Sequence, residues 1–531
     1  MTWTSSGPME GLGDWIFNIA QKVGGLRGWS RNMLAIVAGV FAAVALPPTY
    51  AVPLLLISFP CLIWLIDGAQ TWWRAFWDGW WFGLGFFAAG LYWISHSLVV
   101  DVYFVWLIPF ASLCIPAALG FYIAAAAALA SLVPQGIVRI VVFTAGWVFL
   151  EWLRGILFTG FPWNGIGLVW GFSEVAIQLV AYVGVLGLGL ITVFGASSVA
   201  VLARGQSTTF WPEFFPLFAC VATIFVVGFL RLGLSEKVHY HEDIHLRIVQ
   251  PNIPQKLKWK KTHRDKHLAT FLRLSLEPSS YPITQVIWPE TAVPFIVSHD
   301  TPRRLKMASV VPKNGLLLTG SIRTSARIQK TFQIWNSLHA VSEDGQILMT
   351  HDKFQLVPFG EYIPLGEFFR KYLNLKKITE GRTDFSAGPG PQTISLPNLP
   401  SFSPLICYEV IFPGSVVGPG RRPEWLLNIT NDAWFGESSG PFQHFAMARI
   451  RAVEQGLPLI RAANTGISGV IGPFGRVIKK LSLNTQGIID SALPKPTRYQ
   501  TVFSKVGEWP ILALIFLMFS GPALLRKKLQ N

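Results

Sequence analysis

The chain has 531 residues, of which 51% are hydrophobic and only 14% are charged. About 25% of the residues in a soluble globular protein are charged, so this composition excludes an ordinary soluble enzyme. It also excludes a disordered chain, which would be poor in apolar residues. Four cysteines are too few for a disulfide-stapled scaffold.

The formal net charge of +15 lies mainly in the second half of the chain. Residues 1–231 contain eight Lys or Arg and eight Asp or Glu, whereas residues 232–525 contain 33 and 21. A basic part joined to a hydrophobic part favours an anionic phospholipid surface as the partner. No nucleic-acid-binding motif is found in the sequence, so we expect no nucleic-acid partner.

Uncharged apolar runs predict eight membrane-spanning helices. They lie near residues 32–47, 50–66, 79–100, 104–132, 137–153, 175–203, 214–231 and 509–525. Each run is long enough, with tilt, to cross a hydrocarbon core of about 30 Å. The first run lacks the basic region and the cleavage site of a signal peptide, so we expect it to remain in the protein.

The lysines and arginines of the short loops predict the orientation. With the N-terminus in the cytoplasm, only Arg154 falls in a short outer loop, and the others lie inside: Lys22, Arg27, Arg31, Arg74, Arg139, Arg204, Arg526, Lys527 and Lys528. We therefore expect a bacterial inner-membrane protein with both termini cytoplasmic. We expect residues 1–234 to form a membrane domain with about seven helices, residues 235–505 a periplasmic domain, and residues 506–531 a last helix with a basic tail.

The domain at residues 235–505 has the pattern of an α/β fold. Short runs rich in Ile, Leu and Val predict buried strands at residues 245–249, 285–288, 316–319, 403–406, 426–429 and 459–462. Residues 441–454 have a helical apolar pattern. Residues 467–478 predict a hairpin around a Gly-Pro-Phe-Gly turn.

Cys407 is the only cysteine in this domain. The other three lie in predicted membrane helices, where a thiol usually acts as a small apolar group. Cys407 follows a predicted strand, at the edge where ligands bind in α/β sheets. On this feature alone, an inert buried thiol is the simpler interpretation.

Two other segments change that balance. Glu290 follows a second predicted strand, and Lys353 and Glu361 lie in an otherwise uncharged stretch. A thiol with a pKa of about 8.5 is a weak nucleophile at neutral pH. A carboxylate can take its proton, and a lysine can stabilise both thiolate and oxyanion. Glu290, Lys353 and Cys407 on three strand ends would meet this need, although Glu290 and Lys353 taken singly also fit a solvated ion pair.

Three motifs resemble the Glu, Lys and Cys signatures of the nitrilase superfamily. They are Trp-Pro-Glu at residues 288–290, Lys-Phe-Gln-Leu-Val-Pro-Phe-Gly-Glu-Tyr-Ile-Pro at 353–364 and Ile-Cys-Tyr-Glu at 406–409. With helices on both sides, nearly the whole chain resembles the apolipoprotein N-acyltransferase family. Glu-Trp-Leu-Arg-Gly at 151–155 and Phe-Pro-Trp at 161–163 add to this resemblance.

The resemblance implies a nitrilase-like αββα sandwich at residues 235–505, joined to a membrane α-helical bundle. It also implies acyl transfer from a phospholipid, with phosphatidylethanolamine as the expected donor. The acceptor would be the α-amino group of the N-terminal diacylglyceryl-cysteine of an apolipoprotein. We expect ping-pong kinetics through a thioester, no metal or other cofactor, and a monomer.

The resemblance further implies roles for nine residues. Glu290 is expected to be the general base, Lys353 the oxyanion-stabilising group and Cys407 the nucleophile. The expected supporting and substrate-binding residues are Glu361, Tyr408, Glu409, Trp259, Asn336 and Arg370.

Other segments suggest how lipid is handled. Residues 365–377 mix basic and aromatic residues, which fits a membrane headgroup region and an ordinary amphipathic helix equally well. Residues 256–266 fit a solvated loop better than a lipid contact. Residues 432–436 predict a loop that lines an acyl pocket or closes the fold. Glu151 and Arg154 lie near a membrane boundary, where pairing with each other is favoured over binding a headgroup.

Two other functions are compatible with some of the same sequence features. A membrane-tethered amidase or nitrile hydrolase has the same three residues and lets water resolve the acyl-enzyme, but eight helices exceed what a tether requires. A transporter or scaffold with an inactive domain is disfavoured by the intact set of Glu290, Lys353 and Cys407.

Overall fold

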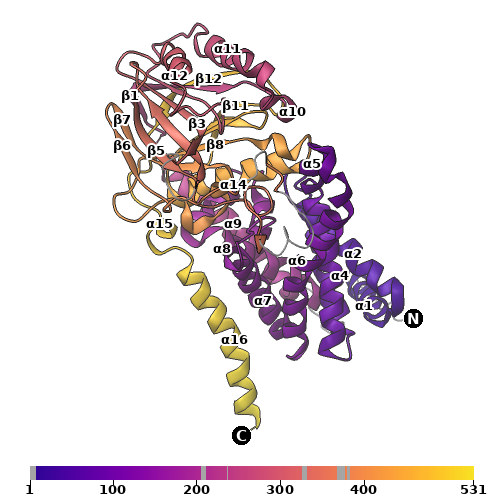
Figure 1. The fold of residues 1–531 in the computed structure, drawn as a ribbon. Coiled ribbons are helices and arrows are strands. Elements are labelled where there is room, and N and C mark those ends of the chain that lie inside the picture. Colours follow the sequence, from indigo (N-terminus) through magenta and orange to yellow (C-terminus); the bar gives the residue numbers. More distant parts are fainter. Residues whose placement is uncertain are drawn as a thin grey trace, which may run out of the picture. The chain divides into compact units, whose positions relative to one another are not determined.

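The computed structural model describes residues 8–204, 211–235, 237–325, 332–366, 377–379 and 383–530. The chain divides into two compact units (Figure 1). The first contains Met1–Tyr92, Leu107–Ser235 and Val502–Asn531, and the second contains Trp93–Trp106 and Glu236–Thr501. The second unit therefore takes one short segment from within the hydrophobic part of the chain.

The first unit is helical. Its α-helices are α1 (Pro8–Gly25), α2 (Gly28–Val44), α3 (Leu55–Asp67), α4 (Trp72–Leu91), α6 (Ile108–Ser131), α7 (Ile137–Ile156), α8 (Val180–Ser198), α9 (Trp211–Gly233), α15 (Val502–Val506) and α16 (Trp509–Gln530). Helix α1 was not predicted, because its apolar residues are interrupted by polar ones and form no continuous run.

Three helical segments among the described residues are long and apolar enough to cross a membrane. They are Val102–Ser131, Ala176–Ala203 and Phe214–Gly233. Three further apolar helices are shorter: Gly28–Val44, Val52–Asp67 and Trp509–Gly521. The predicted number of eight spanning helices is therefore not confirmed.

The single helix predicted over residues 79–100 is wrong. Helix α4 ends at Leu91, and residues 94–99 form a separate short helix, α5 (Ile94–Val99), in the second unit. There the Trp93 ring packs 4.5 Å from that of Phe435, and Trp93 Nε1 donates to Gln443 Oε1 over 3.1 Å. An uncharged run of sequence carries no signal for such a contact, because it forms between distant segments.

Buried charges in the first unit are paired or bound to backbone groups. Arg31 of α2 donates to Asp78 of α4 over 2.9 Å, and Arg139 lies 2.6 Å from Asp67. Glu151 accepts from the backbone of Ile166 over 3.3 Å. Arg154 of α7 donates to two backbone carbonyls of the loop that follows this helix. Glu151 and Arg154 therefore hold this loop, a role that the sequence analysis had not considered.

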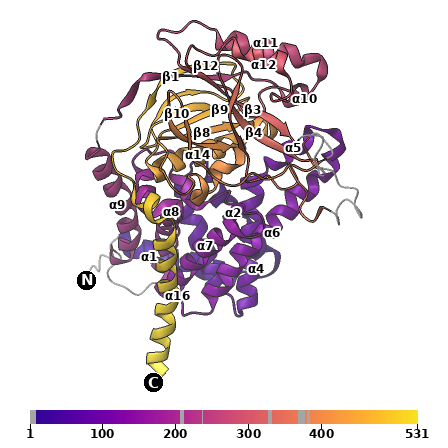
Figure 2. The ribbon, with the colours of Figure 1, turned by 60° about the vertical axis from the view of Figure 1, so that its left-hand side comes forward.

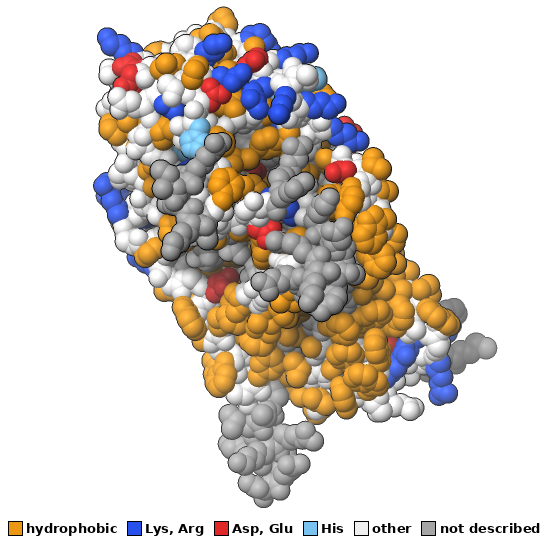
Figure 3. Space-filling model, viewed as in Figure 1, with side chains coloured by type: hydrophobic (Ala, Val, Ile, Leu, Met, Phe, Trp, Pro, Cys, Tyr) orange, Lys and Arg blue, Asp and Glu red, His pale blue; other side chains and the backbone are white. Residues whose placement is uncertain are grey.

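The surfaces of the two units differ. On the face drawn in Figure 3, hydrophobic side chains form a continuous surface on the first unit, whereas Lys and Arg side chains gather on the second. Helix α9 illustrates the apolar surface, since Phe215, Phe218, Phe229 and Leu230 are all more than half exposed. Exposed apolar surface of this extent is typical of contact with a membrane or another protein.

The second unit contains two six-stranded mixed sheets. The first has the order β12-β1-β2-β3-β4-β5, and the second has the order β11-β10-β9-β8-β7-β6. The strands of the first are β1 (Tyr240–Gln250), β2 (Gln285–Ile287), β3 (Leu316–Thr324), β4 (Ile334–Val341), β5 (Ile347–Asp352) and β12 (Gly487–Pro494). Those of the second are β6 (Ile394–Leu396), β7 (Leu399–Ile406), β8 (Trp425–Thr430), β9 (Leu459–Ala463), β10 (Ser468–Ile471) and β11 (Val477–Leu481).

The two sheets share one hydrophobic core. Leu246, Ile287 and Leu318 of the first sheet belong to the same buried cluster as Trp425 and Ile460 of the second. Outside the first sheet, a second cluster includes residues of α11 (Arg264–Ser275) and α12 (Thr301–Ala308), and α14 (Ser439–Gln455) covers the second sheet (Figure 2). The predicted αββα sandwich is confirmed for this unit.

The parallel strands bring the motif residues to one edge. Strands β1, β2 and β3 run parallel to one another, as do β7, β8 and β9. Glu290 follows β2 and Cys407 follows β7, so both lie at the carboxyl ends of parallel strands, where α/β sheets bind ligands.

Candidate active site

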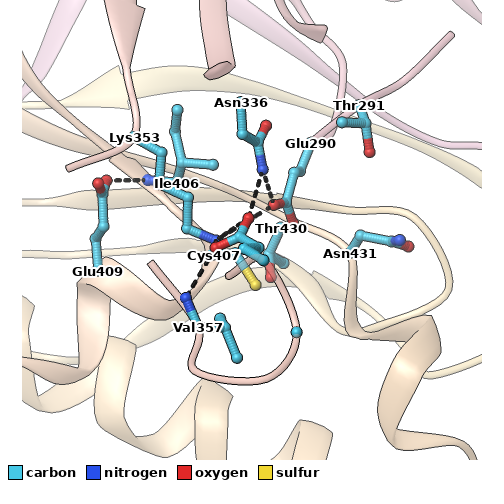
Figure 4. Close-up of polar contacts among 12 residues, drawn as sticks. Glu290, Thr291, Asn336, Lys353, Val357, Ile406, Cys407, Glu409, Thr430 and Asn431 are labelled. Carbon is cyan, nitrogen blue, oxygen red and sulfur yellow. Dashed lines mark hydrogen bonds and ion pairs between the residues drawn. The ribbon is translucent and has the colours of Figure 1, made fainter. Parts of the chain in front are cut away.

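The structure brings Glu290, Lys353 and Cys407 together in one buried site (Figure 4). Their side chains come from the ends of β2, β5 and β7, and each residue is less than a tenth exposed. Lys353 Nζ lies 3.7 Å from Glu290 Oε1. The Glu290 carboxylate raises the pKa of the Cys407 thiol, and the Lys353 ammonium lowers it. The geometry therefore provides a carboxylate, an ammonium and a thiol within one enclosed space.

Glu361 and Asn336 complete the polar contacts of this site. Lys353 Nζ donates to Glu361 over 2.9 Å. Asn336 Nδ2 donates to Glu290 Oε1 over 2.7 Å and to Glu361 Oε1 over 3.2 Å, so one amide joins the two carboxylates. The backbone N–H of Val357 donates to the other oxygen of Glu361 over 2.9 Å. Glu290 and Glu361 are thereby both held beside the lysine.

The ammonium of Lys353 is strongly favoured. Burial lowers the pKa of Lys353. Glu361 and Glu290 raise it by more than burial lowers it, so the pKa is held above its ordinary value. A buried charge is stable only when it is paired and hydrogen-bonded. Lys353 meets both conditions and provides a fixed positive charge beside the thiol.

Cys407 sits in a strained backbone turn. Its φ is +53°, in the left-handed region that costs a non-glycine residue roughly 1–2 kcal/mol. Glu409 holds this turn, since its Oε2 accepts from the N–H of Ile406 over 2.6 Å and its Oε1 accepts from the N–H of Phe354 over 2.6 Å. Glu409 therefore ties the backbone before Cys407 to the backbone after Lys353.

The resting thiol is protonated. Burial raises the pKa of Cys407, and the Glu290 carboxylate raises it further, whereas the Lys353 ammonium lowers it. The resulting pKa lies above the ordinary value for a thiol. A reaction at this sulfur would therefore require a base to remove its proton, and Glu290 is the carboxylate with the largest effect on the pKa of the thiol.

Lys258 is a member of the site that the sequence analysis missed. It is 2% exposed, at the end of α10 (Gln255–Lys258), and its Nζ donates to the carbonyl oxygen of Glu290 over 3.2 Å and to Thr291 Oγ1 over 3.0 Å. Burial lowers the pKa of Lys258 to about 8, while Glu290 and Cys407 act in the opposite direction. The prediction of a solvated loop at residues 256–266 is wrong, because these residues form α10, a short 3-10 helix and the start of α11.

The turn that Lys258 holds is also strained. Thr291 has a φ of +40°, which is rare for a β-branched residue. This turn packs so closely on β3 that a Cβ at Gly320 would lie 2.7 Å from the Cα of Glu290. Glycine at position 320 therefore allows the turn to approach the sheet.

The remaining predicted residues lie at varied positions. Tyr408 is buried, and its ring lies 5.1 Å from that of Phe412 in an edge-on contact. Trp259 is half-buried and directly follows Lys258 at the end of α10. Arg370 lies outside the described residues, as does most of the segment predicted at residues 365–377.

Comparisons with known proteins decide the family. Residues 38–198 match the family model of the apolipoprotein N-acyltransferase N-terminal domain, and residues 245–501 match that of carbon-nitrogen hydrolase. The chain is 40% identical over 522 residues to the apolipoprotein N-acyltransferase of Rhodopseudomonas palustris, covering 94% of this chain and 96% of that protein. The corresponding protein of Bradyrhizobium diazoefficiens is 38% identical over 507 residues, covering 92% and 94%.

The chain belongs to the apolipoprotein N-acyltransferase family. Among solved structures, an amidase from Nesterenkonia sp. AN1 is 19% identical and aligns with a TM-score of 0.34, covering 47% of this chain and 93% of that one. This similarity is too low to support an inference about the site. As a member of this family, the chain is an acyltransferase.

Replacing Lys258 by Met is expected to slow alkylation of Cys407 by iodoacetamide about tenfold at neutral pH. The variant loses a positive charge that favours the thiolate and a charged hydrogen bond of about 1.5–3 kcal/mol that holds the Glu290 turn. Peptide mass spectrometry measures the rate at Cys407 alone. Lys256→Met, two residues away and exposed, is the matched control and should react like the wild type. Equal rates in both variants would contradict a role for Lys258 in the site.

Glu409 is expected to make the stability depend on pH. Burial raises the pKa of Glu409 to about 8, although three backbone N–H groups favour its ionised form. Between pH 4.5 and 8 the folded state then binds more protons than the unfolded state, so this contribution to stability is lost as pH rises through that window. The melting temperature of Glu409→Gln, which does not titrate, should therefore approach that of the wild type between pH 5 and 8. A difference that stays constant or widens would contradict this expectation.

Proposed function

We propose that this chain transfers a fatty acyl group from a membrane phospholipid to the α-amino group of the N-terminal diacylglyceryl-cysteine of apolipoproteins. Its membership of the apolipoprotein N-acyltransferase family supports this function. The observation that carries it is the buried Cys407 beside Glu290 and Lys353. A thiol in this setting can hold an acyl group as a thioester between two substrates.

The first half of the proposed reaction loads the enzyme. Glu290 takes the proton from the Cys407 thiol, and the thiolate attacks the ester carbonyl of the phospholipid. The tetrahedral oxyanion lies beside the ammonium of Lys353, which Glu361 holds in place. The carbon–oxygen bond then breaks, Glu290 gives its proton to the departing lysophospholipid oxygen, and a thioester remains on Cys407. Phosphatidylethanolamine is the donor we expect.

The second half releases the acyl group. The neutral α-amine of the apolipoprotein attacks the thioester, and Glu290 receives a proton from the attacking nitrogen. The carbon–sulfur bond breaks as the amide forms, and the proton returns to the sulfur of Cys407. A thioester reacts with amines more readily than the original oxygen ester, so the intermediate favours transfer. Every proton in this scheme moves through Glu290, which Asn336 orients.

The other predicted residues have supporting roles in this proposal. Glu361 and Asn336 fix Lys353 and Glu290, and Glu409 fixes the turn of Cys407. Tyr408, which directly follows the nucleophile, packs its ring on Phe412 and is proposed to support the turn. We propose substrate contacts for Trp259 and Arg370, on the resemblance of their sequence positions to those of the family.

We also propose that the enzyme is a monomer of the bacterial inner membrane. Residues 1–234 and 506–531 would supply about eight spanning helices, with both termini in the cytoplasm and residues 235–505 in the periplasm. The exposed apolar surface of the first unit supports contact with a membrane, and the arrangement of basic loop residues supports this orientation.

Cysteine labelling tests the orientation. Lys306→Cys, exposed on α12, should react with a membrane-impermeant maleimide in cells whose outer membrane alone is permeabilised. Lys22→Cys, exposed on α1, should react only after the cells are lysed. The wild type, labelled in parallel, corrects for the native cysteines. The reverse pattern would reject a periplasmic catalytic domain.

Intact-protein mass spectrometry tests the reaction itself. After incubation with phosphatidylethanolamine, the purified wild type should gain the mass of one fatty acyl group, and Cys407→Ala should gain none. A lipopeptide with a free α-amine on a diacylglyceryl-cysteine should then discharge the group, whereas the same lipopeptide with a blocked amine should leave it in place. A wild type that gains no acyl group from any phospholipid would reject the proposal. Discharge by water alone would favour an amidase-type hydrolase.

A further inference from the structure

A second group of buried polar side chains contacts Cys407. It consists of Thr430 at the end of β8, Asp432 just after it, His444 of α14 and Arg461 of β9, and each is at most 1% exposed. His444 Nε2 lies 3.1 Å from the carbonyl oxygen of Cys407. None of these side chains has a role in the reaction proposed above.

The contacts of His444 determine which nitrogen carries a proton. Nε2 faces a carbonyl oxygen, which can only accept, so Nε2 must donate. Nδ1 lies 2.9 Å from Asp432 Oδ1 and 3.0 Å from Arg461 Nη2. A neutral ring accepts there from Arg461, and a doubly protonated ring donates to Asp432. In both protonation states the hydrogen bond from Nε2 to Cys407 is kept.

Ion pairs fix the imidazole ring. Arg461 Nη2 lies 2.8 Å from Asp432 Oδ2, and Arg461 Nη1 also donates to Asn428 of β8. Burial raises the pKa of Asp432. Arg461 and His444 lower it by more than burial raises it, so this carboxylate stays ionised. The ring of His444 is thus held by charged groups that belong to rigid strands of the second sheet.

The same network reaches the sulfur. The Thr430 hydroxyl donates to Asp432 Oδ1 over 3.0 Å, and the Thr430 side chain also hydrogen-bonds with the Cys407 thiol. Asp432 therefore connects both contacts: through His444 to the carbonyl of Cys407, and through Thr430 to its thiol. Cys407 is therefore held both at its carbonyl oxygen and at its thiol.

We propose that His444 is a positioning residue, whose hydrogen bond to the carbonyl of Cys407 holds the nucleophile in its left-handed conformation, with Asp432 and Arg461 fixing the ring. The proposal rests on the proposed function, in which Cys407 is the nucleophile. A cysteine near a histidine and an aspartate invites the alternative that His444 is the general base. The geometry argues against this alternative, because Nε2 points at the backbone carbonyl rather than at the sulfur.

Two variants at position 444 separate these roles. His444→Gln keeps an N–H donor near the position of Nε2, whereas His444→Leu has none. We expect His444→Leu to slow single-turnover acylation of Cys407 about 100-fold, because small displacements of a reacting atom have effects of that size. Its KM for phospholipid should stay within about twofold of the wild-type value, and His444→Gln should be within about tenfold of the wild-type rate.

His339→Leu is the matched control for the loss of a buried histidine. His339 is fully buried in the same domain, but its hydrogen bond goes to Thr350, away from Cys407. We expect this variant to lower the melting temperature as His444→Leu does, while its acylation rate stays within about threefold of the wild type.

Three results would overturn the proposal. They are a wild-type acylation rate in His444→Leu, an equal loss in His444→Gln and His444→Leu, and an equal loss in His339→Leu. If the wild type itself is never acylated, the proposed function fails, and the rate of Cys407 alkylation by iodoacetamide replaces acylation as the measure. Slow alkylation in His444→Leu with near-normal alkylation in His444→Gln would still support positioning, and equal rates in the two would overturn it.

Discussion

The candidate site depends on one constraint: a charge buried in a protein interior must be paired with an opposite charge. Lys353 is 1% exposed and contacts Glu361 and Glu290, which are themselves almost fully buried. A lone carboxylate or ammonium in this place would cost several kcal/mol of desolvation, so each group requires the others. In the proposed reaction, transfer of a proton from the thiol of Cys407 to Glu290 moves charge within the cluster without changing its total. The surrounding protein can therefore stay as it is while the nucleophile forms.

Backbone conformation sets the positions of Cys407 and Glu290, the two groups that are proposed to exchange a proton. Cys407 has a positive φ, and so does Thr291, which follows Glu290. Buried donors bind the carbonyl oxygens of both turns, Lys258 at Glu290 and His444 at Cys407. Since each turn is strained by itself, these hydrogen bonds stabilise conformations that the local sequence would not adopt alone.

The sequence predicted the features that depend on local pattern. Glu290 and Cys407 could be placed together because each follows an apolar run of the parallel-strand type, and the carboxyl ends of such strands meet at one edge. Strand β5 was missed because its burial varies along the strand, so it forms no apolar run. Lys258 was missed because nothing in a basic stretch of sequence indicates that one of its lysines is buried. The fold alone buries its side chain and brings its ammonium to the carbonyl oxygen of Glu290. Arg370 lies outside the described residues, so its predicted place is untested.

The segment Trp93–Trp106 belongs to the unit that contains the candidate site, although both of its ends continue into helices of the first unit. It follows α4 directly and leads into α6, yet it folds as part of the second unit. Its Trp93 packs on Phe435, and a Cβ at Gly436 would lie 2.8 Å from the ring of His96, so α5 leaves little space beside the loop that begins at Asp432. The chain between α4 and α6 therefore packs against the loop that carries Asp432, whose charge acts on the pKa of Cys407, so a substitution at Trp93 or His96 would alter the surroundings of a thiol more than 300 positions away in the sequence.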